Sequence, residues 1–330
     1  MAKFTELPQS DLESIIAEFN IGELNGFLPA SNGLDNSNYY ISALKHGRLR
    51  EYVLTLIAPP NQPSELLDPL TRTVSAAGLP VAPLIADRQG NRAGAYQDQA
   101  RLLTQRLKGR HVFNPTIAQC ASVGRFLARF HLIAQSEAGT AKAHPFGIDW
   151  LTQAPSIVQG HVPYTDAVLI QEATKTIVST LKRTDCQTIP SGVIHGDLFR
   201  DNVLFNERGL SGVLDFHDAS LGYWLFDLAI AVNDWCTDNE GVLDSDKTWA
   251  LVRSYHQIRP LVSAELWFFP VFLLYASVTF WLVRLSIALR SEDADLFPFK
   301  NPAEFQKIST QHASHFFYLD QRLLQVHDSE

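Results

Sequence analysis

The sequence contains few cysteines and no excess of positive charge. Its three cysteines, Cys120, Cys186 and Cys236, lie far apart and form no CxxC pair, which favours reduced thiols over a zinc site or a disulfide framework. Lysine and arginine total 27 against 35 aspartates and glutamates, which gives a formal net charge of -8. Because nucleic acids and anionic membranes attract clustered positive charge, we expect neither as a partner. A small cationic or zwitterionic ligand fits this charge better.

Export and membrane insertion are not expected either. Residues 1–6 contain no apolar core before the first acid, so we expect no signal peptide and a cytoplasmic protein. The stretch between Glu265 and Arg284 has no charged residue, but Pro270 and several polar residues interrupt it. We therefore expect this stretch to be a buried helix of the protein core.

The periodicity of the sequence predicts two structurally different parts. With 330 residues, of which 46% are hydrophobic, the chain can bury a substantial core. Over the first hundred residues, strand-like runs at 39–44, 52–57, 81–85 and 101–105 alternate with turn signals, and one helix is expected at 64–77. After residue 109 helical patterns dominate, at 117–131, 166–182, 223–235, 245–257, 264–289 and 302–325. This pattern indicates an α+β fold in two lobes: a small, mainly antiparallel sheet over 1–106 and a larger, mostly helical part over 107–330.

The residues that suggest chemistry are concentrated at 193–218. An apolar strand leads into a polar loop that contains Asp197 and Asn202, and a strand hairpin then delivers Asp215. Phosphoryl transfer requires a carboxylate that orients the attacking hydroxyl and accepts its proton, which suits Asp197. It also requires oxygen ligands for Mg²⁺, which suits Asn202 and Asp215. Each residue alone fits an ordinary structural role in a turn, loop or strand end. The combination predicts a kinase.

This combination resembles a known superfamily. His-Gly-Asp at 195–197, an asparagine five residues after the aspartate, and Asp-Phe after one hairpin resemble the catalytic and metal loops of protein-kinase-like enzymes. His-Gly-Asp in place of His-Arg-Asp is similar to the aminoglycoside and choline kinase branch, whose acceptors are small molecules. The resemblance implies a two-lobed protein-kinase-like fold, with ATP and Mg²⁺ as cofactors. It also implies that His195 and Asp227 support the catalytic loop structurally.

Longer strings resemble the homoserine kinases of this superfamily. The similar segments are 33–39, 52–56, 195–205, 226–236, 280–285 and 300–305, in the family's order and over nearly the whole chain. The resemblance implies transfer of the γ-phosphoryl group of ATP to the side-chain hydroxyl of L-homoserine. The products would be ADP and O-phospho-L-homoserine, an intermediate on the way to threonine. Asp197 would face the attacking hydroxyl.

The resemblance also places the nucleotide in the first lobe. The segment 33–39 would lie over the phosphates, although its sequence equally fits an ordinary polar hairpin turn. Most kinases carry a phosphate-binding lysine on the third strand, where this chain and the family have Thr55, and what replaces that charge stays open. The hinge would contact adenine through backbone groups. The expected nucleotide-binding residues are Asn36, Ser37, Asn38, Thr55, Gln105 and Leu107.

L-Homoserine carries an ammonium and a carboxylate group, so its pocket should supply an acid and a base. Arg284 is the candidate for the carboxylate, because it lies in an otherwise uncharged helix where an unpaired arginine is costly. An internal ion pair would explain Arg284 equally well. Asp234 or Asp218 could bind the ammonium, with a helix cap or a surface acid as the alternative for each.

Two other functions stay open at this point. The acceptor could be another amino alcohol, such as choline, ethanolamine or an aminoglycoside, although a choline site would favour an aromatic cage over a cationic partner. Because Thr55 stands in place of the usual lysine, a pseudokinase that binds nucleotide without catalysis is the other alternative. The presence of all three expected catalytic and metal-binding residues argues against it: Asp197, Asn202 and Asp215. The sequence leaves the oligomeric state open, a homo-oligomer included.

Overall fold

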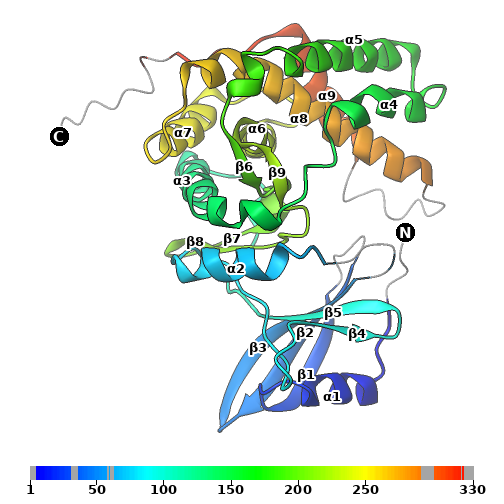
Figure 1. Cartoon of the computed structure of the whole chain (residues 1–330), viewed down its shortest axis with the longest axis vertical. Helices are drawn as coiled ribbons and strands as arrows, with labels where there is room; N and C mark the ends of the chain where they lie inside the picture. The colour runs from blue at the N-terminus through cyan, green and yellow to red at the C-terminus, as the bar shows by residue number, and fades with distance from the viewer. Residues whose placement is uncertain are drawn as a thin grey trace. The chain divides into compact units, whose positions relative to one another are not determined.

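The computed structural model describes residues 5–30, 36–57, 59, 63–290, 301–320 and 322 (Figure 1). The chain forms two compact units, and each is described by itself. The first comprises Met1–Gly109 with Ser211–His217, and the second comprises Arg110–Leu210 with Asp218–Glu330. The functional division expected from the sequence, a nucleotide-binding lobe over 1–106 and a catalytic lobe over 107–330, stays a prediction.

A five-stranded antiparallel sheet forms the body of the first unit. Its strands, in sheet order, are β1 (Glu23–Ala30), β2 (Asn36–Lys45), β3 (Arg48–Ile57), β5 (Gln99–Gln105) and β4 (Ala93–Tyr96). His46 and Gly47 form the two-residue turn between β2 and β3 with φ angles of 50° and 73°. Positive φ at both positions matches the right-handed twist of the strands that such a turn joins. The antiparallel sheet that the sequence predicts is therefore confirmed.

Two helices accompany this sheet. Helix α1 (Gln9–Ala17) buries Leu12, Ile15 and Ile16 against the alternating apolar positions of β2 and β3. Helix α1 was not expected from the sequence, although its buried residues recur at helical spacing. Helix α2 (Leu67–Ala76) lies within the expected range 64–77. The prediction of a strand at 81–85 is wrong. Val81 and Leu84 form only isolated bridges, with Val213 and Thr104 respectively, so this segment does not pair continuously with one strand.

Helices form most of the second unit, with one short strand pair inside it. Strand β6 (Ser191–Ile194) pairs with β9 (Ser220–Tyr223). A separate two-stranded sheet is formed by β7 (Val203–Asn206) and β8 (Gly209–Val213). The helices are α3 (Ile117–Ala134), α4 (Ile148–Val158), α5 (Tyr164–Leu181), α6 (Trp224–Trp235), α7 (Ser245–His256), α8 (Ser263–Arg290) and α9 (Pro302–Ser314). Helix α4 was not expected from the sequence, and the last helix is shorter than expected, because α9 ends at Ser314 and not at 325.

Two helices form the core of this unit. All residues of α6 are buried, and α6 contacts α3, α7, α8 and both strands of the β6–β9 pair (Figure 1). Within the described part of the chain, Ser263–Leu289 is the one helix long and apolar enough to cross a membrane, and 83% of its most apolar window is buried inside the protein. The burial confirms that this stretch is a core helix.

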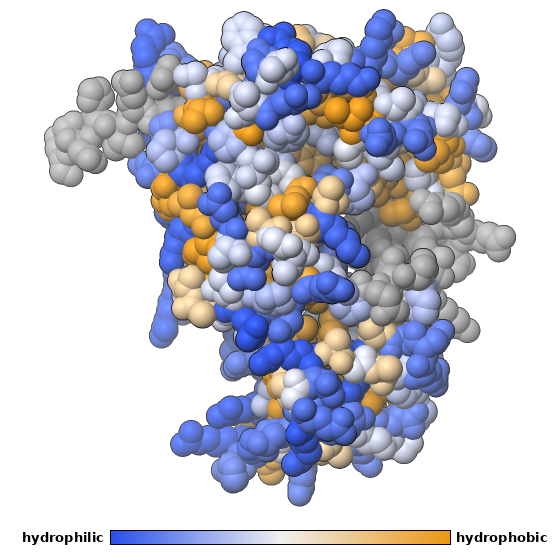
Figure 2. All heavy atoms as spheres, in the orientation of Figure 1, coloured by the Kyte–Doolittle hydropathy of each residue, from blue (hydrophilic) through white to orange (hydrophobic). Residues whose placement is uncertain are grey.

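On the face shown in Figure 2, hydrophobic residues form small patches among hydrophilic ones, as on ordinary protein surfaces.

Helices α3 and α7 approach each other closely at Gly124. A Cβ atom at this position would overlap the backbone carbonyl of Leu251 on α7. Only glycine allows this approach without moving one helix away from the other. The contact matters for the site because α3 and α7 carry two of the buried polar side chains described below.

We predict that Gly124→Ala lowers the free energy of unfolding by about 1–3 kcal/mol, because the methyl group forces α3 and α7 apart. Urea denaturation measures the change. Gly139→Ala is the matched control, since a Cβ there meets nothing within 4 Å and should leave stability unchanged or slightly raised. Wild-type stability in the Gly124 variant would contradict the close packing.

Candidate active site

One face of α6 holds the loop that contains Asp197. Asp227, Asp234 and Trp235 are spaced so that they lie on the same side of a helix with 3.6 residues per turn. The carboxylate of Asp227 accepts the backbone N–H of His195 at 2.7 Å and that of Gly196 at 2.9 Å. The indole Nε1 of Trp235 donates to the carbonyl of Leu198 at 3.0 Å. The backbone of the loop is therefore fixed on both sides of Asp197.

A buried histidine completes the surroundings of Asp227. His131 Nε2 lies 2.9 Å from Asp227 Oδ2, and His131 Nδ1 lies 2.7 Å from the hydroxyl of Tyr255. Burial lowers the pKa of His131, so the imidazole is neutral and donates from Nε2 while Nδ1 accepts the Tyr255 proton. Burial by itself would raise the pKa of Asp227, but the hydrogen bonds from His131 and from Gly196 N–H lower it. Asp227 is thus a carboxylate within the core.

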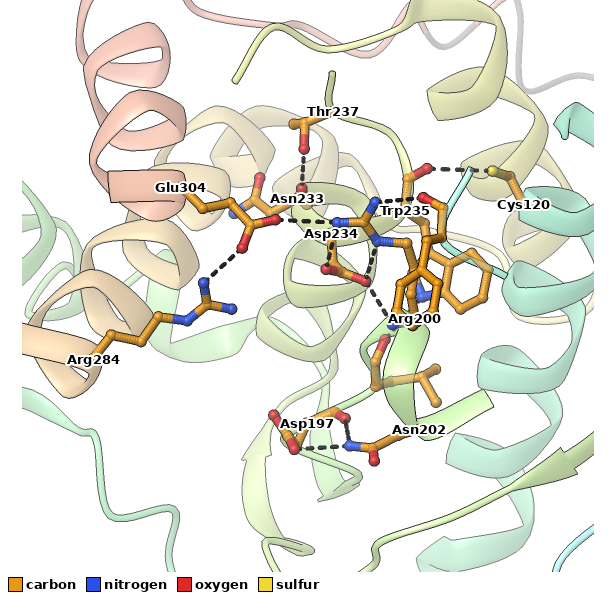
Figure 3. A network of polar contacts seen from close by, with 12 residues as sticks. Cys120, Asp197, Arg200, Asn202, Asn233, Asp234, Trp235, Thr237, Arg284 and Glu304 are labelled. Carbon is orange, nitrogen blue, oxygen red and sulfur yellow. Dashed lines mark hydrogen bonds and ion pairs between the residues drawn. The ribbon is translucent and has the colours of Figure 1, made fainter. Parts of the chain in front are cut away.

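The far end of the loop is held by an ion pair (Figure 3). The backbone N–H of Arg200 donates to Asp234 Oδ2 at 2.6 Å, and the guanidinium of Arg200 contacts both oxygens of that carboxylate at 3.2 Å. Arg200 also donates to the carbonyl of Phe113 at 2.8 Å and to Glu304 Oε1 at 3.1 Å. Burial acts to lower the pKa of Arg200, but the charges of Asp234 and Glu304 outweigh it and raise that pKa.

Asp197 and Asn202 are in direct contact inside this loop. Asn202 Nδ2 donates to the backbone carbonyl and to the Oδ2 atom of Asp197, each at 2.8 Å. Because both partners are acceptors, the amide orientation is fixed and presents Oδ1 as an oxygen of the type that Mg²⁺ accepts. Asp197 is 7% exposed, and its N–H donates to His195 Nδ1 at 3.3 Å.

Gly196 is required by the shape of the loop. Its φ angle is 80°, and a Cβ atom there would lie 2.9 Å from the carbonyl oxygen of Asp218. Both the left-handed conformation and the close approach favour glycine. The same contact places the backbone of Asp218 beside the loop, and the Asp218 side chain is exposed.

The residues expected to bind nucleotide belong to the first unit, as does Asp215. Asp215 is exposed and has a φ angle of 58°, which is uncommon for a residue other than glycine and tolerated best by aspartate and asparagine. Thr55 donates its hydroxyl to Asn38 Oδ1 at 2.7 Å, and Ser37 accepts the N–H of Thr5 at 2.8 Å. Gln105 ends β5 and is exposed, Leu107 is half-buried, and residues 33–35 of the expected phosphate loop lie outside the described residues. The metal and nucleotide roles of these residues stay predictions.

Arg284 and Asp234, two of the candidates for acceptor binding, already have protein partners. Arg284 donates to Glu304 Oε2 at 2.6 Å, which matches the ion pair that the sequence left as an alternative. The carboxylate of Asp234 is bound by Arg200. Sequence reasoning did not assign a role to Arg200, His131 or Glu304. For Arg200 a signal existed, because an arginine three residues after the proposed base lies inside the same loop.

A magnesium ion fits the chemistry of this loop. Among the described residues, no group of three or more histidine, cysteine, aspartate or glutamate side chains could hold a metal ion by itself. Mg²⁺ in kinases is bound by one or two protein oxygens together with the phosphates of the nucleotide, so a complete protein cage is not needed. The side-chain oxygen of Asn202, oriented by the contacts of its amide with Asp197, suits such a shared site.

Comparisons with known proteins show the family of this chain. A model of the phosphotransferase enzyme family matches residues 26–261. The chain belongs to this family. Homoserine kinases of Pseudomonas aeruginosa and Janthinobacterium sp. are 33% and 31% identical to this phosphotransferase over 307 and 312 residues. Each match covers 93% of this chain and 95% of the relative.

Solved structures show the fold of the phosphotransferase. Amicoumacin kinase hAmiN, in complex with AMP-PNP, Ca²⁺ and Ami, has a TM-score of 0.70 at 16% identity, covering 92% of this chain and 94% of that chain. The microcompartment-associated aminopropanol kinase also has a TM-score of 0.70 at 16% identity, covering 92% and 97%. The predicted α+β, protein-kinase-like fold is confirmed by these neighbours, with an antiparallel sheet in one unit and helices in the other.

We predict that Asp227→Asn lowers the free energy of unfolding by about 2–4 kcal/mol, because an amide cannot accept all three buried N–H groups. The kcat of phosphoryl transfer should fall with it, since the loop loses its anchor. Urea denaturation and steady-state kinetics measure both effects. Asp185→Asn, at an exposed ion pair with Arg183, should behave like wild type. An Asp227 variant of normal stability would refute the anchoring role.

Stability should fall as the pH drops from 6.5 to 4. Burial lowers the pKa of His312 to about 4, below the ordinary histidine value near 6.5. The unfolded chain therefore binds a proton that the folded chain excludes, and the stabilisation present above pH 6.5 is lost as the pH approaches 4. For His312 the loss reaches about 3 kcal/mol at pH 4, and burial of His131 acts in the same direction. Urea denaturation at several pH values gives the free energy of unfolding as a function of pH. Between pH 6.5 and 4 this free energy should change less steeply in His312→Gln than in wild type, and equal pH dependence in the two proteins would count against this account.

Proposed function

We propose that the protein is a homoserine kinase that transfers the γ-phosphoryl group of ATP to the side-chain hydroxyl of L-homoserine. The observation that carries the proposal is the identity of 33% with homoserine kinases over 93% of this chain. The fixed Asp197–Asn202 pair in a protein-kinase-like fold supports the phosphoryl-transfer part of the proposal independently of those relatives. The product, O-phospho-L-homoserine, would serve threonine biosynthesis.

In the proposed reaction the acceptor hydroxyl attacks the γ-phosphorus of ATP. A bond forms between this oxygen and phosphorus, the bond from phosphorus to the β–γ bridging oxygen breaks, and ADP leaves. Asp197 would orient the hydroxyl and take its proton. Asn202 holds one oxygen of that carboxylate at 2.8 Å, so the proton acceptor keeps a single orientation. Mg²⁺, when bound, neutralises charge on the phosphates.

The pair Asp197 and Asn202 is also suited to hold its geometry during turnover. The anchors from Asp227, Trp235 and Asp234 fix the loop on both sides of Asp197 without using the Asp197 side chain. A preorganised base avoids a conformational cost at the moment of reaction. Asn202 is the proposed Mg²⁺ ligand in this unit, and Asp215 stays the second ligand predicted from the sequence.

We predict that L-homoserine stimulates ADP release from Mg-ATP more than L-serine, L-threonine, choline or kanamycin. Asp197→Asn should lower kcat by about 10²–10⁴-fold with little change in KM, because it removes the proton acceptor. Asp201→Asn is the matched control: it changes an exposed acid of the same loop and should retain wild-type activity.

The outcomes separate the competing functions. ADP release with another acceptor would keep the kinase and refute L-homoserine as its substrate. Measurable ATP binding without release on any acceptor would support a nucleotide-binding scaffold instead. Full activity in Asp197→Asn would refute its role as the base.

A further inference from the structure

Arg284 is a buried arginine with only part of its hydrogen-bonding capacity used. The residue is 6% exposed. Its Nη1 donates to Glu304 Oε2 at 2.6 Å and to the carbonyl of Asn301 at 3.1 Å. Its Nε is buried and has no hydrogen-bond partner within the described part of the chain. A charged N–H group removed from water requires an acceptor, so the side of Arg284 that carries Nε calls for a ligand.

The geometry of the guanidinium group defines the chemistry of that ligand. Nε–H and one N–H of Nη2 point in parallel along the same edge, at the spacing of two carboxylate oxygens. A hydroxyl or an amide carbonyl offers one oxygen for the two N–H groups to share, whereas a carboxylate offers a separate, charged oxygen to each. Glu304 and Asn301 approach through Nη1, which leaves this edge to a different partner.

Arg284 is also connected to the loop that holds Asp197 (Figure 3). The carboxylate of Glu304 binds Arg284 with Oε2 and Arg200, the third residue after Asp197, with Oε1 at 3.1 Å. Phe280, one turn before Arg284 on α8, packs against Phe199 of the loop with ring centroids 4.7 Å apart. One carboxylate and one ring contact thus join the surroundings of Arg284 to two consecutive residues of the loop, Phe199 and Arg200.

The guanidinium of Arg284 is held in place from two directions. Its central carbon lies 4.4 Å from the centroid of the Phe305 ring, and Glu304 from the same helix, α9, binds its outer end. A cation held over an aromatic ring and by an ion pair loses little further freedom when it binds a ligand. This arrangement is what a preorganised carboxylate receptor requires.

We propose that Arg284 binds the carboxylate group of the amino-acid acceptor through Nε and Nη2, and that Glu304 fixes its guanidinium from the opposite side. The inference rests on the proposed function, because it assigns a group of that function's substrate to a residue. Arg284 then distinguishes hydroxy amino acids from amino alcohols that lack a carboxylate.

The test compares Arg284→Lys with wild type on L-homoserine and on 3-amino-1-propanol, which has the same chain without the carboxylate. Lysine keeps the charge and removes the parallel N–H pair. The KM for L-homoserine should rise by about 10- to 100-fold, the loss of one charged bidentate contact. The KM or inhibition constant of 3-amino-1-propanol should stay within about twofold. An equal loss for both compounds, or an unchanged KM for L-homoserine, would overturn the proposal.

Two further variants keep the test decisive. Arg183→Lys is the matched control, since Arg183 also stacks on a phenylalanine, Phe268, and pairs with an acid, Asp185, away from the loop. Glu304→Gln is the second variant, because its partly exposed side chain can be replaced without burying a new group. It should raise the KM for L-homoserine selectively, by a smaller factor than Arg284→Lys. If Arg284→Lys fails to fold in thermal denaturation, an unchanged KM in Glu304→Gln overturns the proposal.

The wild-type data separate this inference from the proposed function. Failure of the wild-type enzyme to phosphorylate L-homoserine would refute the function, and the inference with it. Normal wild-type turnover together with an unselective Arg284→Lys variant would refute only the role of Arg284.

Discussion

Asp227 is fully buried, and the conformation of the loop around Asp197 depends on the hydrogen bonds that its carboxylate accepts. A carboxylate in the core is costly unless its oxygens are bonded, and here three N–H groups converge on it. Two of them belong to consecutive peptide units directly before Asp197. The carboxylate therefore fixes the orientation of two successive peptide planes, and with them the direction in which the side chain of Asp197 extends from the backbone.

The hydrogen-bond network around Asp227 extends beyond α6. His131 comes from α3 and Tyr255 from α7, so the carboxylate is joined through hydrogen bonds to two further helices. The close approach of α3 and α7 at Gly124 brings these two helices together. Packing and hydrogen bonding thus support one another, since neither polar side chain could reach its partner if the helices lay further apart.

The sequence predicted the parts of the site that are local in the chain. Asp197 and Asn202 are five residues apart in one loop, so their contact could be expected from a short string. Partners separated by long stretches could not be found in this way: His131 and Asp227 are 96 positions apart in the sequence, and Arg200 and Glu304 are 104 positions apart. The pairing of such residues is decided by helix packing, which a single sequence does not specify.

The fold, like the candidate site, was predictable where the local sequence pattern was strong. The alternation of β2 and β3 gave a clear periodic signal, and the long uncharged, apolar run of α8 gave a clear compositional one. Helix α4 contains Pro155, which weakens its local signal, and the strand expected at 81–85 has the right composition but no continuous partner. Tertiary contacts therefore decided the segments whose local preferences were weak or mixed.

The anchors of the loop and the surroundings of Arg284 come from different helices, and this separation has an evolutionary consequence. Asp227, Asp234 and Trp235 lie on α6, whereas Arg284, Glu304 and Phe305 lie on α8 and α9. Substitutions on the two outer helices could accumulate while the loop kept its shape. Under the proposed role of Arg284, such substitutions would change the acceptor without changing the loop. Arg200 and Glu304 form the ion pair through which the two groups of helices must stay compatible.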